Sequence, residues 1–294
     1  MKAYNKLNEE DKNNIIKAFY DKSNIAKSFK EMSKECNVSE RAFSRVLKEN
    51  NIDGRNKNRY KLNDNYFNVI DMEHKAYWLG LLYADGYVGN NNFNNIVISL
   101  TISDMYILEE FAKDIEFTGD IRIDENGGGF SNGTPKAVLN FSSIKMAEDL
   151  RALGLYPGKS KSMTSIPNIP KEFIPHFIRG YFDGDGSIHT TKYYENDRGI
   201  KRYRIRNVFS MIGTIDFLNE IRNHIPAKLT RQPCKSENME YVVCNVNSRL
   251  LNIYNYLYGN ATIYLTRKFD KWNEIIRALE EKSSMEKQGE LLEG

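Results

Sequence analysis

Residues 177–188 read FIRGYFDGDGSI, a stretch that begins with the apolar residues of a buried helix and ends with two aspartates separated by glycine. A helix C-terminus carries partial negative charge, and burial penalises the ionised form of a carboxyl group. Asp183 and Asp185 therefore stand where carboxylates are unfavourable. We expect the folded protein to neutralise their charge at this position.

The chain repeats this pattern. Residues 76–88 read AYWLGLLYADGYV, so Asp85 and Gly86 recur 100 residues later as Asp185 and Gly186. Two copies of an unusual pattern at a domain-sized spacing predict a pseudo-symmetric pair of modules. Small residues four apart share one helical face in each copy, where two helices can approach closely; they are Gly80, Ala84, Gly180 and Gly184. If the copies pack on each other, Asp85 and Asp185 lie side by side.

The composition limits the class of protein. With 294 residues, of which 40% are hydrophobic and 12% aromatic, the chain can bury a core and form two or three domains. A mean hydropathy of −0.59 and the lack of an apolar run of about 18 residues exclude a membrane span. The polar start MKAYNKLNEEDKN is unlike a signal peptide, so we expect a cytoplasmic protein. Cys36, Cys234 and Cys244 form no CxxC pair, which predicts free thiols and disfavours structural zinc.

Charge is distributed unevenly along the chain. Residues 1–62 hold 15 Lys and Arg against 9 Asp and Glu, an excess of six positive charges. Because the whole chain has a formal net charge of +3, the remainder carries −3. A small basic N-terminal segment on a nearly neutral body is a common arrangement in nucleic-acid-binding proteins.

Residues 1–52 predict a small all-α domain that resembles a helix-turn-helix. Residues 28–52 read helix, short turn, helix, and Ser39 is the expected N-cap of the second helix. Arg41, Ser44 and Arg45 point outward from that helix, which we expect to enter the major groove of DNA. The expected inner residues are Met32, Val38, Phe43, Val46 and Leu47. The alternative is a three-helix protein-binding or oligomerisation module.

The body of the chain predicts an α+β fold. A basic, aperiodic linker at 53–66 leads to two halves at 67–157 and 158–282 and a tail at 283–294. In the first half we expect helices at 73–85, 104–116 and 143–153 and strands near 87–89, 94–102, 119–124 and 137–142. In the second half we expect helices at 171–185, 214–225 and 248–258 and strands near 187–194, 202–211, 228–232 and 240–247. A closing helix is expected at 268–282.

Alternation along the second expected strand of each half indicates which sheet face is functional. In the first half, Ser99 and Thr101 share the face opposite the apolar residues Ile96, Ile98, Leu100 and Ile102. In the second half, Arg202, Arg204 and Arg206 share the face opposite Tyr203, Ile205, Phe209 and Met211. Three alternating arginines favour contacts with nucleic-acid phosphates and bases over a merely solvated face.

The segments WLGLLYADG (78–86) and IRGYFDGDG (178–186) resemble the paired LAGLIDADG motifs of homing endonucleases, in the single-chain form with two motifs per polypeptide. The resemblance covers roughly residues 67–280. It implies two αββαββα halves whose motif helices pack at a pseudo-dyad and whose two antiparallel sheets form a saddle over DNA. It also implies a monomeric, site-specific double-strand DNA endonuclease with a long, nearly asymmetric target site.

The resemblance further implies the metal site. The last acidic residue of each motif, Asp85 or Asp185, binds the catalytic metal, and the backbone carbonyls of Ala84 and Gly184 add ligands. The chemistry agrees, because divalent ions between two carboxylates activate water and stabilise the leaving oxygen in phosphodiester hydrolysis. Hard oxygen ligands and an anionic substrate favour Mg²⁺, or Mn²⁺, over zinc.

Each half is also expected to place a basic residue near the scissile phosphate. GKSKS offers Lys159 and Lys161 in the first half, and YLTRK offers Arg267 and Lys268 in the second. Both segments follow the last helix of their half. We favour Lys159 and Lys268 as catalytic residues, against the alternative of solvated or backbone-contacting lysines.

Other interpretations of the motifs are possible. The first motif has Tyr83 where the second has Asp183. In the family this position is usually a helix-end or structural one, so we expect Asp183 to cap the helix rather than to take part in chemistry. A calcium loop at 183–186 is disfavoured, because an EF-hand needs Glu at its twelfth position, where this chain has Tyr194. Relatives that lose cleavage can act as intron RNA maturases or transcription regulators. A pure binder has no need of two carboxylates that repel each other and DNA, so we favour an active endonuclease.

Overall fold

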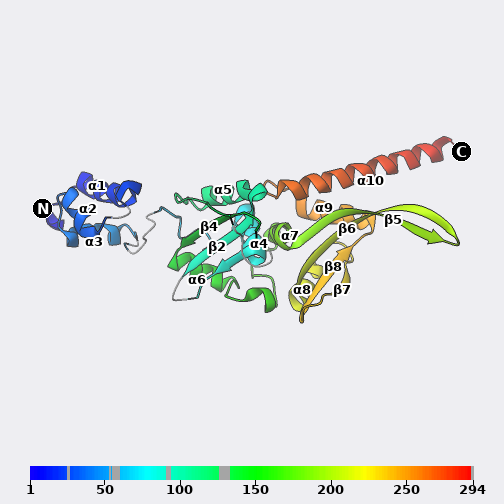
Figure 1. The fold of residues 1–294 in the computed structure, drawn as a ribbon, viewed down its shortest axis with the longest axis horizontal. Helices are drawn as coiled ribbons and strands as arrows, with labels where there is room; N and C mark the ends of the chain where they lie inside the picture. The colour runs from blue at the N-terminus through cyan, green and yellow to red at the C-terminus, as the bar shows by residue number, and fades with distance from the viewer. Residues whose placement is uncertain (25–26, 53, 55–59, 91–93, 126–132, 293–294) are drawn as a thin grey trace. The chain divides into compact units, whose positions relative to one another are not determined.

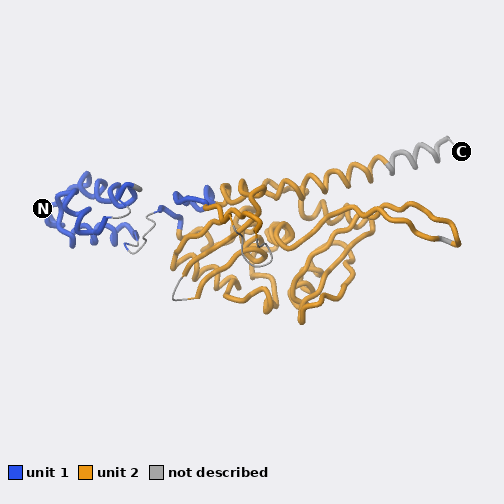
Figure 2. Tube along the Cα trace, in the orientation of Figure 1, with its two compact units in different colours: residues 1–63, 112–121 blue, residues 64–111, 122–294 orange. Residues whose placement is uncertain are grey.

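The computed structural model describes residues 1–24, 27–52, 54, 60–90, 94–125 and 133–292, and side chains for all of these except 22, 197 and 282–292. The chain divides into two compact units, residues 1–63 with 112–121 and residues 64–111 with 122–294 (Figure 2). No helix in the described ranges is both long and apolar enough to cross a membrane.

The described part of the first unit is built on α1 (Glu9–Tyr20), α2 (Phe29–Glu35) and α3 (Glu40–Glu49) (Figure 1). Side chains of Asn8, Ser28 and Ser39 accept backbone N–H bonds at the three helix starts, which confirms the predicted N-cap at Ser39. One apolar core joins the helices; it consists of Ile15, Phe19, Met32, Val38, Ala42, Phe43, Val46 and Leu47. All five residues expected on the inner face are in this core.

The second unit contains two four-stranded antiparallel sheets, each with its third strand in sequence at the edge beside the fourth. The first has the order β1 (Gly86–Val88), β2 (Asn95–Thr101), β4 (Lys136–Ser142) and β3 (Arg122–Asp124). The second has the order β5 (Gly186–Asp197), β6 (Ile200–Thr214), β8 (Met239–Cys244) and β7 (Thr230–Pro233). The identical strand order in the two sheets matches the predicted pseudo-symmetry.

Helices complete the two halves. The first half has α4 (Glu73–Asp85), α5 (Met105–Asp114) and α6 (Ile144–Ala152), and the second has α7 (Ile174–Asp185), α8 (Ile215–His224) and α9 (Asn247–Tyr258). The closing helix, α10, spans Thr266–Leu292 and is longer than the predicted 268–282. The predicted α+β fold with two αββαββα halves is therefore confirmed.

The motif helices α4 and α7 are buried on all sides rather than on one stripe. Eight consecutive residues of α4, from Ala76 to Tyr83, are buried, and so are residues 177–183 of α7. A helix that is apolar all round lies in the interior, because a surface helix keeps one polar face. The motifs therefore form the centre of the second unit.

Several strands end differently from the expectation. The chain leaves β2 after Thr101, and Ile102 begins a 3₁₀ turn (η3, Ile102–Asp104) in which its side chain is 44% exposed instead of facing the core. The β5–β6 hairpin is longer than predicted, because Arg198 and Gly199 have φ of 51° and 84°. A two-residue turn with positive φ at both positions lets the strands pair up to their ends.

Candidate active site

The backbones of the two motif helices touch. A Cβ placed on Gly80 of α4 would lie 2.0 Å from the carbonyl oxygen of Phe177, and one on Gly180 of α7 would lie 2.0 Å from that of Tyr77. Any side chain at either position would collide with backbone, so this approach requires glycine. The close helix contact predicted from the small residues is confirmed.

The contact brings the C-terminal ends of α4 and α7 together. A Cβ on Gly184 would lie 2.3 Å from the Cβ of Ala84 and 2.8 Å from Oδ2 of Asp85, so the two Asp-Gly ends are adjacent. Neither helix has a basic residue in its last turn to offset the partial negative charge there. Asp85 and Asp185 therefore meet at the ends of their helices that are least favourable for a carboxylate.

The two carboxylates oppose each other's ionisation. Burial, followed by the charge of Asp85, raises the pKa of Asp185 to about 6. Asp85 keeps an exposed surface, yet the protein atoms crowded around it raise its pKa as well, against the lowering effect of nearby Lys and Arg side chains. A bound cation would relieve this repulsion.

Of the two lysines in GKSKS, Lys159 lies at the site. Its side chain is 4% exposed, and its Nζ donates a long hydrogen bond of 3.5 Å to the carbonyl oxygen of Ala84. Burial lowers the pKa of Lys159, while the charges of Asp185 and Asp85 raise it, so the ammonium is near both carboxylates. Lys161, at the end of the same short turn (η5, Lys159–Lys161), is exposed.

Lys268 is the corresponding residue in the second half. Its Nζ donates to the carbonyl oxygens of Phe182, Asp183 and Gly186, at 2.5, 2.7 and 2.6 Å, and these three bonds use all the N–H groups of the ammonium. Burial lowers its pKa to about 8, against the opposing charges of Asp183, Asp85 and Asp185. The neighbouring Arg267 instead pairs with Asp104, at 2.9 Å.

The donor set at the helix ends suits a hard divalent cation. Asp85 and Asp185 supply carboxylate oxygens, and Ala84 and Gly184 have carbonyl oxygens beside them. Across the described ranges, no group of three or more His, Cys, Asp and Glu side chains is placed to hold a metal. Further ligands would therefore come from the backbone, water or substrate, an oxygen environment that Mg²⁺ accepts and structural zinc does not.

The outer face of the first sheet carries Ser99 and Thr101. Alternate residues of β2 are buried, so these two lie opposite the core, as predicted. The strand register also places Lys136, Asn140 and Arg122 on this face, opposite Thr101, Val97 and Val138 respectively. The sequence-based expectations did not include these three residues. In KAVLNFS (136–142), Lys136 and Asn140 alternate with the apolar Ala137, Leu139 and Phe141, and this period of two could have indicated both of them.

Arg202, Arg204 and Arg206 are exposed and share one face of β6, as the alternation predicts. Tyr203 and Ile205, which we expected to face the core, are 52% and 61% exposed. The reason is that β8 pairs with β6 only from Phe209 to Thr214, so residues 200–208 pair with β5 alone and form a two-stranded ribbon (Figure 1). A ribbon without a third strand or a helix behind it exposes both faces.

Side chains of β5 contact Arg204 and Arg206 on the ribbon. Arg204 Nε donates to Glu195 at 2.9 Å, and Arg206 donates to the Tyr193 hydroxyl at 2.7 Å with its guanidinium 4.8 Å from the centre of that ring. These bonds hold the guanidinium groups on the outer face. They are surface interactions, so DNA phosphates or bases can compete for them at little cost.

The helical unit exposes the residues that we assigned to DNA. Arg41 and Ser44 are exposed on α3. Arg45 is exposed too, but it pairs with Glu49 at 2.9 Å and lies 4.1 Å from the centre of the Tyr4 ring. The expected inner and outer faces of this helix are therefore correct, and Arg45 would have to exchange its partners to contact DNA.

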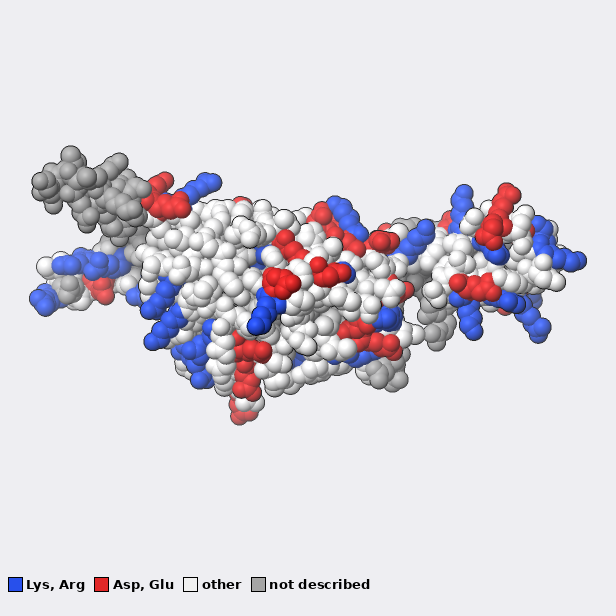
Figure 3. All heavy atoms as spheres, turned by 180° about the vertical axis from the view of Figure 1, so that it is seen from behind, with Lys and Arg blue, Asp and Glu red and all other residues white. Residues whose placement is uncertain are grey.

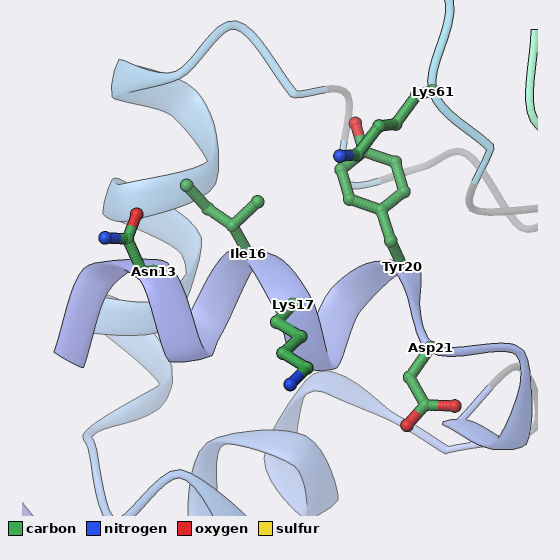
Figure 4. A pocket seen from close by; sticks show the side chains of 6 residues that line it. All are labelled: Asn13, Ile16, Lys17, Tyr20, Asp21 and Lys61. Carbon is green, nitrogen blue, oxygen red and sulfur yellow. The ribbon is translucent and has the colours of Figure 1, made fainter. Parts of the chain in front are cut away.

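An open pocket in the first unit has different chemistry. It is lined by Asn13, Ile16, Lys17, Tyr20, Asp21 and Lys61 (Figure 4). Its one carboxylate, on Asp21, accepts hydrogen bonds from Ser23, so the pocket offers no pair of acids. The face of the molecule drawn in Figure 3 carries basic side chains interspersed with acidic ones. A surface of one charge sign therefore does not indicate a nucleic-acid site on that face.

No protein-family model matches the chain. An uncharacterized protein of Methanocaldococcus jannaschii is 31% identical over 150 residues, which are 50% of this chain and 55% of that protein. The chain thus spans little more than half the length of the curated relative that it matches.

Solved structures share the fold. The I-LtrWI LAGLIDADG homing endonuclease bound to target DNA matches with a TM-score of 0.51 and 13% identity, over 75% of this chain and 92% of that chain. The I-SmaMI LAGLIDADG homing endonuclease bound to cleaved DNA matches with a TM-score of 0.50 and 14% identity, over 73% and 92%. The chain therefore has the LAGLIDADG homing endonuclease fold, with both motifs in one polypeptide. The resemblance inferred from the two motifs is confirmed at the level of the fold.

Proposed function

We propose that this protein is a site-specific double-strand DNA endonuclease in which Asp85 and Asp185 hold Mg²⁺ or Mn²⁺. The observation that carries the proposal is the pair of adjacent carboxylates, whose burial and repulsion raise the pKa of Asp185 to about 6. Such a pair destabilises a protein that binds no cation. I-LtrWI and I-SmaMI, which have the same fold, are bound to target DNA and to cleaved DNA in their structures.

The residues of the site would divide the work of hydrolysis. When bound, the divalent cations activate water and stabilise the leaving oxygen of the phosphodiester. Lys159 has one long hydrogen bond in the described structure, so its ammonium has donors to offer a phosphate oxygen. Lys268 spends its three donors on carbonyl oxygens and would instead supply a fixed positive charge beside the reacting phosphate.

DNA recognition would use the outer faces of both sheets and the exposed face of α3. The strands of the β5–β6 hairpin have 12 and 15 residues, whereas β1 and β2 have 3 and 7. Unequal contact surfaces in the two halves suit a long target whose half-sites differ. Both halves belong to one polypeptide, so a monomer would present the complete saddle.

Cleavage mapping tests the proposal. The protein is incubated with a plasmid library of candidate insertion sites, in Mg²⁺ or in EDTA, and the DNA ends are sequenced. We expect both strands to be cut at one site in Mg²⁺ and neither in EDTA. Asp85→Asn and Asp185→Asn should each abolish cutting but keep or tighten binding, because each removes a metal ligand and a charge that repels phosphate.

Two results would contradict the proposal. Full cutting by either Asn variant would show that the site is assigned to the wrong residues. Equal cutting in EDTA would show that cleavage does not depend on a metal. Specific DNA binding without cleavage in Mg²⁺ or Mn²⁺ would instead indicate a transcription regulator. Preferential binding to intron RNA would indicate a maturase.

A further inference from the structure

The two motifs differ two residues before the metal-site aspartate. Asp183 of the second motif is completely buried and accepts three hydrogen bonds from three segments of the chain. The donors are the hydroxyl of Tyr77 at 2.9 Å, the hydroxyl of Tyr258 at 2.8 Å and the backbone N–H of Leu265 at 2.8 Å. A buried carboxylate with three donors is held firmly, because each lost bond would leave charge unsatisfied.

Through Leu265, this carboxylate controls the start of α10. The carbonyl oxygen of Leu265 accepts the N–H groups of Lys268 and Phe269, both at 3.0 Å, so the first turn of α10 begins from it. The ammonium of Lys268 then returns to the backbone oxygen of Asp183 at 2.7 Å. Asp183 therefore holds both ends of Lys268. Its carboxylate holds the backbone of Lys268 through Leu265, and its backbone carbonyl oxygen accepts a hydrogen bond from the Lys268 ammonium.

The first half is braced differently at the equivalent position. Tyr83 has no carboxylate, and its hydroxyl donates to the carbonyl oxygen of Leu153 at 2.5 Å. Leu153 is the C-cap of α6, and Lys159 follows it six residues later. Among the hydrogen bonds of the described residues, the one that joins Lys159 to its own motif helix is the 3.5 Å bond to Ala84. The two candidate lysines are therefore positioned by unlike devices.

We propose that Asp183 is a positioning residue for Lys268. Cutting of the DNA strand that Lys268 serves depends on Asp183, whereas cutting of the other strand does not, because the first half has Tyr83 at the equivalent position. The inference rests on the endonuclease function proposed above. It assigns Asp183 no contact with DNA or metal. Loss of its bonds would let the start of α10 shift, and the charge of Lys268 would move away from the phosphate of the strand that it serves.

Strand-resolved kinetics test this inference. A duplex with the mapped target is labelled on each strand in turn and cut under single-turnover conditions at saturating enzyme in Mg²⁺. Lys268→Met first identifies the strand that depends on Lys268. Asp183→Asn, which keeps the shape of the side chain, should slow that same strand by about 10- to 100-fold and leave the other within about twofold. The Kd for DNA should not change, and supercoiled plasmid should accumulate as nicked circles.

Two further variants complete the test, one as a matched control in the first half and one as a second way to weaken the bonds to Asp183. Tyr83→Phe removes the hydroxyl at the equivalent position of the first half, and it should leave the strand assigned to Lys268 at its original rate. Tyr258→Phe removes one of the three bonds to Asp183 and should slow that strand by roughly threefold or more. If Asp183→Asn does not fold by circular dichroism, Tyr258→Phe decides the matter.

Three outcomes would overturn the inference: equal slowing of both strands, slowing of the strand that does not depend on Lys268, or no slowing by Asp183→Asn and Tyr258→Phe in folded protein. If the unchanged protein cuts both strands, any of these leaves the endonuclease function intact. If the unchanged protein cuts neither strand, the proposed function is wrong and this inference is overturned with it.

Discussion

At the scale of single residues, the carboxyl group of Asp185 is held where folding opposes its charge. Its pKa is about 6 in the folded protein against an ordinary value of 3.8. A carboxyl group with a raised pKa in the folded state makes folding less favourable as pH rises from the unfolded value through the folded one, since the unfolded chain releases its proton first. The cost is fully present above pH about 6 and disappears well below pH about 4.

This linkage predicts an unusual gain in stability. In EDTA at pH 7.5, Asp185→Asn should raise the free energy of unfolding by about 1–3 kcal/mol, because the neutral amide avoids the burial of a charge and the repulsion from Asp85. The gain should shrink at pH 5, where the native carboxyl group is mostly protonated. Urea unfolding at the two pH values measures both effects. Mg²⁺ should stabilise the unchanged protein but not the variant, and a variant no more stable than the unchanged protein at pH 7.5 would contradict the assignment.

At the scale of elements, the contact between α4 and α7 depends on two glycines. Helix propensity alone predicts that Gly→Ala stabilises a helix by about 1 kcal/mol. The tertiary contact predicts the opposite sign, because the new Cβ of Gly80→Ala would lie 2.0 Å from the carbonyl oxygen of Phe177. We expect Gly80→Ala and Gly180→Ala each to lower the free energy of unfolding by about 2–5 kcal/mol. A stabilising effect in urea unfolding would show that the helices are farther apart than described.

The β5–β6 ribbon makes a second prediction for one element. Arg204→Ala should weaken DNA binding by about 1–3 kcal/mol and relax preference at one base position, if its guanidinium exchanges Glu195 for a guanine edge. Ile205→Ala, which changes the opposite face of the same strand, is the matched control and should leave binding unchanged. Binding measured across a panel of single-base target variants separates the cases. A uniform loss with a shallower salt dependence would identify a phosphate contact instead.

At the scale of the whole molecule, the helical unit has its own core, and the residues of the proposed cleavage site all belong to the second unit. Tyr60 packs against Phe117 with ring centres 4.7 Å apart, and the N–H of Lys61 donates to the Thr118 hydroxyl at 2.8 Å. A truncation should therefore spare residues 60–63. It can remove residues 1–54 without cutting these contacts.

Deletion of residues 1–54 should raise the Kd for DNA and shorten the protected footprint. A tethered second DNA-binding unit raises effective concentration at a composite site without touching the chemical step. The single-turnover cutting rate at saturating enzyme should therefore stay the same. If the truncated protein is folded by circular dichroism but cuts no DNA at saturation, the helical unit must help to assemble the active complex.

Local patterns in the sequence determined much of this protein. The repeated Asp-Gly motif, the glycines four residues apart, the Ser39 cap and the alternation along β2 and β6 predicted the elements, the contact between motif helices and the acid pair. The cap, the glycine spacing and the alternation depend on neighbours within about one turn or one strand, and such short-range periodicity is written directly in the sequence. The contact between motif helices and the acid pair followed instead from the repeat, whose two copies are 100 residues apart. Local patterns offered both Lys159 and Lys161, which stand in the same short segment, and the structure showed that Lys159 is the buried one.

Only the tertiary structure decided how distant segments meet. It buried Lys159 against Ala84, 75 positions away, and joined Asp183 to Tyr77, 106 positions away. It also left Tyr203 and Ile205 exposed, because the core ends before the ribbon does. Alternation assigns a residue to a face of a strand, but burial depends on whether another element covers that face, which no local pattern records.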